Sequence, residues 1–181
     1  LEKGIEPDVV AGHSLGEYSA LFAAGVLNVS EAVKLVRTRG KLMSEADPEG
    51  KGTMAAIIGL TAKEVEEVCE KGSQYGIVEP ANYNTPSQIV ISGEKEAIEK
   101  TVEIAKEAGA KRAIPLNVSG AFHSQLMKSA GEKLAQKLNE VDFKEPENPI
   151  VTNINAQFET EATTIKGALV KQINNPVRWE E

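Results

Sequence analysis

The chain has 181 residues, of which 41% are hydrophobic and 26% charged, and its formal net charge is −7 at pH 7. This balance is typical of a soluble globular protein, and it argues against a disordered chain and against the broad basic surface of a nucleic-acid-binding protein. No apolar run approaches the roughly 20 residues that a membrane span needs, and the single cysteine, Cys69, excludes an internal disulfide and a cysteine-based zinc site; we expect a cytoplasmic protein with no membrane contact.

The first predicted elements open a parallel α/β arrangement. A buried strand over residues 9–11 leads through a glycine-containing turn into a helix that ends near Gly25. A second helix runs from an N-cap at Ser30 to about Ala46. Because an active-site turn follows so soon after Leu1, we expect a central portion of a longer chain, truncated at both ends.

The middle of the chain has the periodicity of a separate unit. Its predicted order is strand, helix, strand, strand, helix, strand, which is the ferredoxin-like βαββαβ pattern. Thr61 and Glu64 form a capping box, and Gly72 and Gly109 occupy helix C-cap positions. The predicted elements are strand 54–59, helix 61–71, strands 77–82 and 88–92, helix 94–108 and strand 112–118.

After this unit, the outer arrangement resumes with a loop that carries His123, a helix over 125–139, a short strand over 150–154 and a helix over 163–173. We therefore predict an α/β fold with two parts. Residues 1–52 and 119–181 form part of an α/β-hydrolase-like parallel-sheet domain, and residues 53–118 form the inserted ferredoxin-like subdomain.

The turn Gly12-x-Ser14-x-Gly16 lies between a buried strand and a helix, which is the setting of a nucleophile elbow. The glycines permit a sharp turn that exposes the Ser14 hydroxyl, and the free N–H of Leu15 at the helix start can donate to an oxyanion. The alternative is an ordinary serine in a glycine-rich turn.

A serine nucleophile needs a base, and the chain offers two histidines. His13 adjoins Ser14 in the turn and should project away from it, so we expect His123 to be the base. No carboxylate has a reason to meet His123; Asp47, for example, lies in a linker. A backbone carbonyl can accept the imidazole Nδ1 proton instead.

Arg39 interrupts an otherwise apolar helix stripe, where a guanidinium is costly to bury without an anionic partner. One interpretation is a substrate carboxylate bound bidentately by the guanidinium; the other is a side chain that reaches the surface or pairs with a nearby glutamate. We interpret Cys69 as a core residue, and Asn82 and Asn84 as turn residues rather than ligands.

Several motifs together resemble the malonyl-CoA:acyl-carrier-protein transacylases of bacterial fatty-acid synthesis. The resemblance spans essentially the whole chain. The motifs are GHSLGEYSA at 12–20, RGK at 39–41, the 82–90 stretch, AFHS at 121–124 and NPVRW at 175–179.

The resemblance implies a reaction. Ser14 takes the malonyl group from malonyl-CoA as an ester, His123 acts as base and then as acid, and Arg39 binds the malonyl carboxylate. The phosphopantetheine thiol of an acyl carrier protein then accepts the group. Neither a metal nor a redox cofactor is implied, and we expect a monomer.

The resemblance also assigns supporting residues. The Leu15 amide is half of the oxyanion hole, the Gln172 carbonyl orients the histidine, Phe122 leaves no room for a methyl branch, and Met43 lines the same pocket. The family's glycine- and glutamine-containing loop, which supplies the second oxyanion donor, and its glycine-rich C-terminal segment have no counterpart here, so we expect the isolated piece to be poorly active.

Three alternatives stay open. The chain could be an acyltransferase domain piece of a polyketide synthase, or a non-catalytic fragment that keeps the motifs of its parent. A serine esterase is a weaker alternative because Arg39 would then have no partner.

Overall fold

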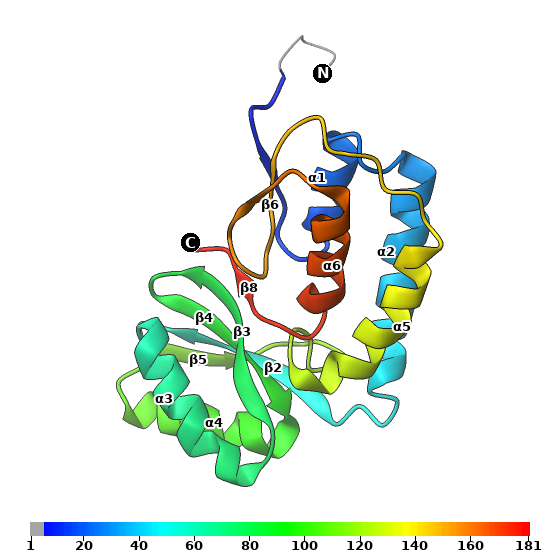
Figure 1. The fold of residues 1–181 in the computed structure, drawn as a ribbon. Coiled ribbons are helices and arrows are strands. Elements are labelled where there is room, and N and C mark those ends of the chain that lie inside the picture. The colour runs from blue at the N-terminus through cyan, green and yellow to red at the C-terminus, as the bar shows by residue number, and fades with distance from the viewer. Residues whose placement is uncertain (1–5) are drawn as a thin grey trace.

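The opening strand and turn predicted from the sequence are present in a computed structural model, which describes residues 6–181, but the strand is partly exposed and not buried as expected (Figure 1). β1 (Val10–Ala11) pairs in parallel with β6 (Ile150–Val151), and β7 (Phe158–Glu159) adds to β6 in the antiparallel direction. The strand expected over 150–154 is therefore shorter than predicted, because the chain turns back directly after Val151. This small sheet places β1, near the start of the sequence, beside β6, about 140 residues later.

Four helices surround the first hydrophobic core, and Figure 1 shows them gathered on one side of the small sheet. They contribute large apolar side chains such as Leu21, Leu35, Leu134 and Leu169 to it. The helices are α1 (Gly16–Ala23), α2 (Val29–Ala46), α5 (Lys128–Asn139) and α6 (Ala162–Gln172), and the short 3-10 helix η2 (Gln125–Met127) precedes α5.

The N-cap of α2 is Asn28 and not Ser30, which corrects the prediction. The Asn28 side chain accepts a hydrogen bond from the Glu31 N–H at 3.0 Å, and the Glu31 carboxylate accepts one from the Asn28 N–H at 2.9 Å. This reciprocal pair satisfies two N–H groups at the helix start, whereas Ser30 at that point already has helical backbone geometry.

The second core lies between a mixed sheet and two helices. The sheet order is β5-β2-β4-β3-β8, and its first four strands are antiparallel neighbours, which is the order expected of a βαββαβ unit. Cys69 packs in this core. The elements are β2 (Gly52–Ile58), α3 (Ala62–Gly72), the 3-10 helix η1 (Ser73–Tyr75), β3 (Val78–Thr85), β4 (Gln88–Glu94), α4 (Lys95–Glu107) and β5 (Arg112–Pro115).

Local signals in this unit are confirmed in part. The Thr61–Glu64 capping box is present, and Gly109 has the left-handed φ of +98° expected after a helix. Gly72 was wrongly expected to do the same, because the chain continues into η1 and turns at Gly76 with φ +136°. A Cβ on Gly72 would lie 1.9 Å from Thr101 Oγ1, so close packing of α3 on α4 requires that glycine.

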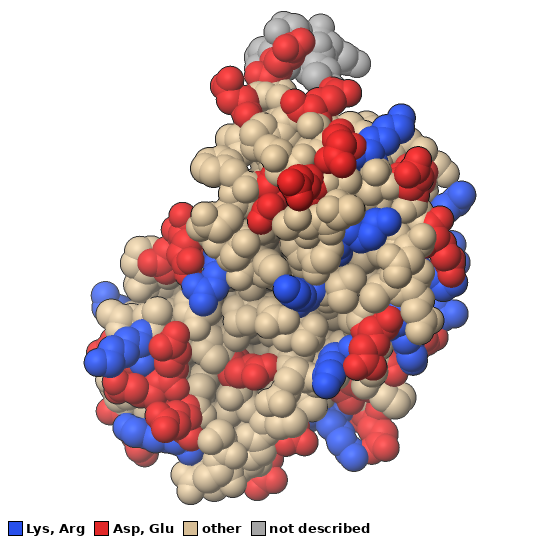
Figure 2. Space-filling view, in the orientation of Figure 1, with Lys and Arg blue, Asp and Glu red and all other residues tan. Residues whose placement is uncertain are grey.

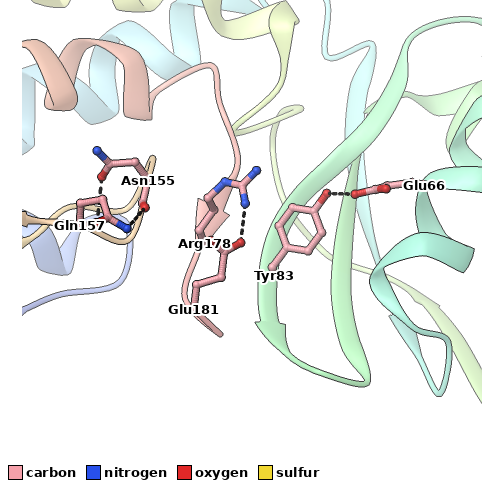
Figure 3. Close-up of polar contacts among 6 residues, drawn as sticks. All are labelled: Glu66, Tyr83, Asn155, Gln157, Arg178 and Glu181. Atoms are coloured by element: carbon pink, nitrogen blue, oxygen red, sulfur yellow. Dashed lines mark hydrogen bonds and ion pairs between the residues drawn. The ribbon is translucent and has the colours of Figure 1, made fainter.

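The two units join along β3. β8 (Val177–Arg178), which the sequence did not predict, pairs in parallel with β3, and the guanidinium of Arg178 lies 5.9 Å from the Tyr83 ring centroid. Figure 3 shows these two side chains on adjacent strands, with the Tyr83 hydroxyl donating to Glu66 at 2.9 Å. The division into 1–52 with 119–181 and 53–118 stays a prediction, since a third apolar cluster around Met54 and Val90 packs against Phe122 across the expected boundary.

The α/β fold class predicted from the sequence is confirmed, and the surface agrees with the charge balance. On the face drawn in Figure 2, acidic side chains gather toward the top, basic side chains are scattered among acidic ones elsewhere, and no broad basic area forms. None of the helices in the described part of the chain has the length and apolarity that crossing a bilayer requires.

Candidate active site

The turn after β1 holds Ser14 in a left-handed backbone conformation, with φ +52°. A Cβ on Gly12 would lie 2.0 Å from the Gly16 carbonyl oxygen, whereas a Cβ on Gly16 would meet nothing within 4 Å. The tight turn therefore requires glycine at position 12 alone. The Asn153 side chain closes the turn, since its Oδ1 accepts from the Ser14 N–H at 2.6 Å and its Nδ2 donates to the Gly12 carbonyl at 2.8 Å.

His123 lies next to the serine hydroxyl. Its Nε2 is 2.7 Å from Ser14 Oγ, and its Nδ1 is 2.8 Å from the Gln172 carbonyl oxygen. A carbonyl only accepts, so Nδ1 carries the proton and Nε2 is left to accept the hydroxyl proton of Ser14. Burial lowers the pKa of His123 to about 4, and the imidazole is therefore neutral at pH 7.

Arg39 reaches the same point from α2. Its Nη2 donates to Ser14 Oγ at 2.9 Å and to the Gln172 side-chain oxygen at 3.0 Å. The residue is only 5% exposed, its Nε has no partner, and it forms no ion pair within residues 6–181. Burial lowers the pKa of this guanidinium. The nearby Glu17 carboxyl partly offsets this effect, but no carboxylate in the described residues contacts the guanidinium, so it keeps strong donors for a carboxylate beside the serine.

Gln172 contacts the site through its side chain as well as its carbonyl. Its Nε2 donates to the Ser14 carbonyl at 2.9 Å and to Glu17 Oε2 at 2.5 Å. Glu17 is fully buried in the first turn of α1, and burial raises the pKa of its carboxyl to about 7. Sequence reasoning did not identify Glu17, Asn153 or the Gln172 side chain as site groups.

One of these omissions had a usable signal. Asn153 follows β6 by two residues, and the carboxyl ends of parallel strands meet at one edge of a sheet. A parallel pairing of the predicted strands at 9–11 and 150–154 would have placed Asn153 beside the turn at Ser14. Glu17 carried no such signal, because an acidic residue in the first turn of a helix is common on protein surfaces.

A cavity of about 300 Å³ opens onto these groups. Met43 and Phe122 belong to its wall, as predicted for residues that shape an acyl pocket, and Asn82 joins them from β3. Asn82 and Asn84 were expected in a turn but lie in this strand, because β3 extends to Thr85. The lining residues are His13, Ser14, Arg39, Gly40, Met43, Met54, Asn82, Phe122 and His123.

The two remaining groups named from the sequence lie at the edge of the site. His13 Nε2 bonds Asn84 Oδ1 at 2.8 Å, and its ring packs edge-on against Trp179 with the centroids 5.4 Å apart. Leu15 is 49% exposed, and its N–H makes no hydrogen bond within the described residues. A larger cavity of about 630 Å³ lies between α5 and α6, and Ser14, His123 and Arg39 are not among the residues that line it.

Comparison with known proteins gives one consistent result. Residues 2–181 match the family described as acyl transferase domain. The chain is 52% identical over 181 residues to the malonyl CoA-acyl carrier protein transacylase of Bacillus subtilis, and 50% identical over 176 residues to the enzyme of that name in Escherichia coli. These alignments cover 99% and 97% of this chain and 57% of each relative, so the chain spans little more than half their length.

Solved structures agree with the sequence relatives. An acyl-carrier-protein S-malonyltransferase from Burkholderia pseudomallei superposes with a TM-score of 0.96 at 50% identity, covering 98% of this chain and 58% of that one. A malonyl-transacylase in complex with a type II PKS acyl-carrier protein has a TM-score of 0.95 at 51% identity, with the same coverage.

Proposed function

We propose, because this chain belongs to the acyl transferase domain family, that it transfers a malonyl group from malonyl-CoA to the phosphopantetheine thiol of an acyl carrier protein. The resemblance predicted from the sequence motifs is confirmed at the level of the family. The observation that carries the proposal is the buried guanidinium of Arg39, which bonds the serine hydroxyl and forms no ion pair in the described part of the chain.

The first half of the proposed reaction acylates Ser14. His123 Nε2 accepts the hydroxyl proton as Ser14 Oγ attacks the thioester carbonyl, and the Gln172 carbonyl holds the imidazole in the required tautomer. The Leu15 N–H lies at the start of α1, where it can donate to the oxyanion that forms. Collapse of this intermediate expels the coenzyme A thiolate, which takes the proton from His123.

The second half returns Ser14 to its free state. The carrier thiol gives its proton to His123 and attacks the malonyl ester, and Ser14 leaves with that proton. No electron transfer occurs in either half, so the chemistry calls for no redox cofactor, and Arg39 supplies the charge that holds the malonyl carboxylate. Phe122 and Met43 on the cavity wall would limit the width of the acyl group.

The identity of the carrier is a second question. The relative solved with a type II PKS acyl-carrier protein is as similar to this chain as the curated transacylases are. A polyketide carrier is therefore an alternative acceptor for the same chemistry. A cytoplasmic, monomeric protein stays a prediction from the sequence.

The proposal is tested by the intact mass of the chain after incubation with malonyl-CoA. We expect a malonyl adduct on the wild-type chain, none on Ser14→Ala and a strongly reduced amount on Arg39→Ala. Because the isolated piece is expected to react slowly, a folded wild-type chain that gains no adduct even on prolonged incubation would favour the non-catalytic alternative. An adduct that persists in Ser14→Ala would show that another residue is the nucleophile.

A further inference from the structure

Gln172 connects the two halves of the candidate site. Its backbone carbonyl accepts from His123 Nδ1, and its side-chain oxygen accepts from Arg39 Nη2. A glutamine amide has one acceptor end and one donor end, so its rotation decides which end faces the guanidinium. If the amide turned over, two donor groups would face each other at Arg39.

Glu17 is one of the groups that set this rotation. Its Oε2 accepts from Gln172 Nε2 at 2.5 Å, and the Ser14 carbonyl accepts from the same nitrogen at 2.9 Å. Both acceptors bond the nitrogen end of the amide, which leaves the amide oxygen to accept from the guanidinium. The contacts join residues 133 to 158 positions apart in the chain, and they form one connected chain from Glu17 through Gln172 to Arg39.

The fold keeps Glu17 at a cost. The carboxyl is fully buried, its Oε1 has no partner, and it forms no ion pair within residues 6–181. A buried carboxyl that is only partly satisfied normally destabilises a protein. Within residues 6–181 its side-chain hydrogen-bond partner is Gln172, and orienting that amide is a role that can account for a carboxyl at this position.

We propose that Glu17 is a positioning residue for substrate recognition: as the acceptor for Gln172 Nε2, it fixes the amide so that the Gln172 oxygen sets the guanidinium of Arg39 for the substrate carboxylate. This inference rests on the proposed function. It assigns Glu17 no contact with substrate and no proton transfer.

The test compares two reactions of Ser14. Malonyl-CoA requires the carboxylate contact of Arg39, whereas a fluorophosphonate without a carboxylate requires only the serine and its base. We expect Glu17→Ala to slow malonylation about 100-fold, the effect of a displacement of about 1 Å in a reacting group, and to slow fluorophosphonate labelling less than about tenfold. Glu17→Gln keeps an acceptor oxygen at this position and should recover most of the lost malonylation rate.

Gln172→Met provides a second variant that keeps the backbone carbonyl and removes the amide. It should reproduce the Glu17→Ala effect, and the double variant should be no slower than either single one, because both remove the same contact. If Glu17→Ala does not fold, the inference is tested with the other two variants: Gln172→Met should lose malonylation and keep labelling, and Glu17→Gln should keep both.

Failure of the inference and failure of the proposed function give different results. If the wild-type chain is malonylated and Glu17→Ala changes both reactions by the same factor, Glu17 is merely structural and the inference is overturned. Equal losses in Glu17→Ala and Glu17→Gln would overturn it too, because the acceptor oxygen would not be what matters. If the wild-type chain takes the fluorophosphonate but no malonyl group, the proposed function fails and the inference falls with it.

Discussion

Replacing Arg39 with methionine separates what the guanidinium does for function from what it does for stability. Methionine has a similar unbranched stem and fills much of the same space without the charge. The guanidinium makes two hydrogen bonds, to Ser14 and to Gln172, while its buried Nε has no hydrogen-bond partner among residues 6–181. The variant therefore removes a carboxylate-binding group that is poorly satisfied in the free protein.

The expected loss of activity follows from the contacts that a bound carboxylate would make. Two charge-assisted hydrogen bonds contribute about 1.5 to 3 kcal/mol each. Their loss from Arg39→Met corresponds to a decrease in kcat/KM for malonyl-CoA of roughly 10² to 10⁴-fold.

The expected change in stability is small by comparison. Removing a buried charge is often neutral or stabilising, which offsets the loss of the bonds to Ser14 and Gln172. We expect the free energy of unfolding of Arg39→Met to stay within about 2 kcal/mol of the wild-type value. Urea unfolding measures this quantity on the same preparation that is used for kinetics.

The assay follows the rate of malonyl adduct formation on Ser14 by intact mass, with fluorophosphonate labelling of the same serine as the reference. Arg39→Met should lose malonylation and keep labelling within about tenfold of wild type, because only malonylation uses the carboxylate contact. A variant that malonylates at the wild-type rate would refute the role of Arg39. A variant that loses both reactions equally would show that the guanidinium serves the serine and not the carboxylate.

Three further predictions concern the turn and the buried titratable groups. Gly12→Ala should destabilise the fold by about 3 kcal/mol or more and abolish labelling of Ser14, because its Cβ would overlap the Gly16 carbonyl; Gly16→Ala, with open space around it, is the matched control and should stay near wild type in urea unfolding. The rate of fluorophosphonate labelling of Ser14, which does not use the Arg39 contact, should be level between pH 5 and pH 8 and fall as pH drops through about 4, because His123 must be neutral and its pKa is lowered to about 4. An inflection near pH 6.5 in this labelling profile would contradict the lowered pKa. Burial raises the pKa of Glu17 from 4.5 to about 7, so the stabilising contribution of its protonated form is complete below pH 4.5 and is lost as pH rises through 7. In urea unfolding, the free energy of unfolding of wild type should fall by about 3 kcal/mol relative to that of Glu17→Gln across this range. A difference between the two that does not change with pH would exclude the raised pKa.

Local patterns predicted much of the fold. The strand and turn at Ser14, the capping box at Thr61 and the glycine after α4 each depend on a few neighbouring residues, so their signals survive in the sequence alone. The N-cap of α2 was misplaced by two residues because Asn28 and Ser30 are both good capping residues, and only Asn28 meets a reciprocal glutamate three positions later.

The two-residue strands β7 and β8 were missed for a different reason. A strand of two residues has no period to detect, and it exists only because a distant strand supplies its hydrogen bonds. β8 depends on β3, almost a hundred residues earlier in the chain, and it helps to join the two units of the fold.

The sequence by itself determined the fold class, the nucleophile elbow, the family and the set of residues proposed to carry the reaction, because each depends on residue patterns within short segments of the chain. Only the tertiary structure decided how these residues are held. Asn153 closes the turn at Ser14, and Gln172 links Glu17 to Arg39, through hydrogen bonds between residues more than 130 positions apart. Such contacts leave no periodic pattern in the sequence. Which of the many polar residues becomes a buried contact depends on where the folded chain places it.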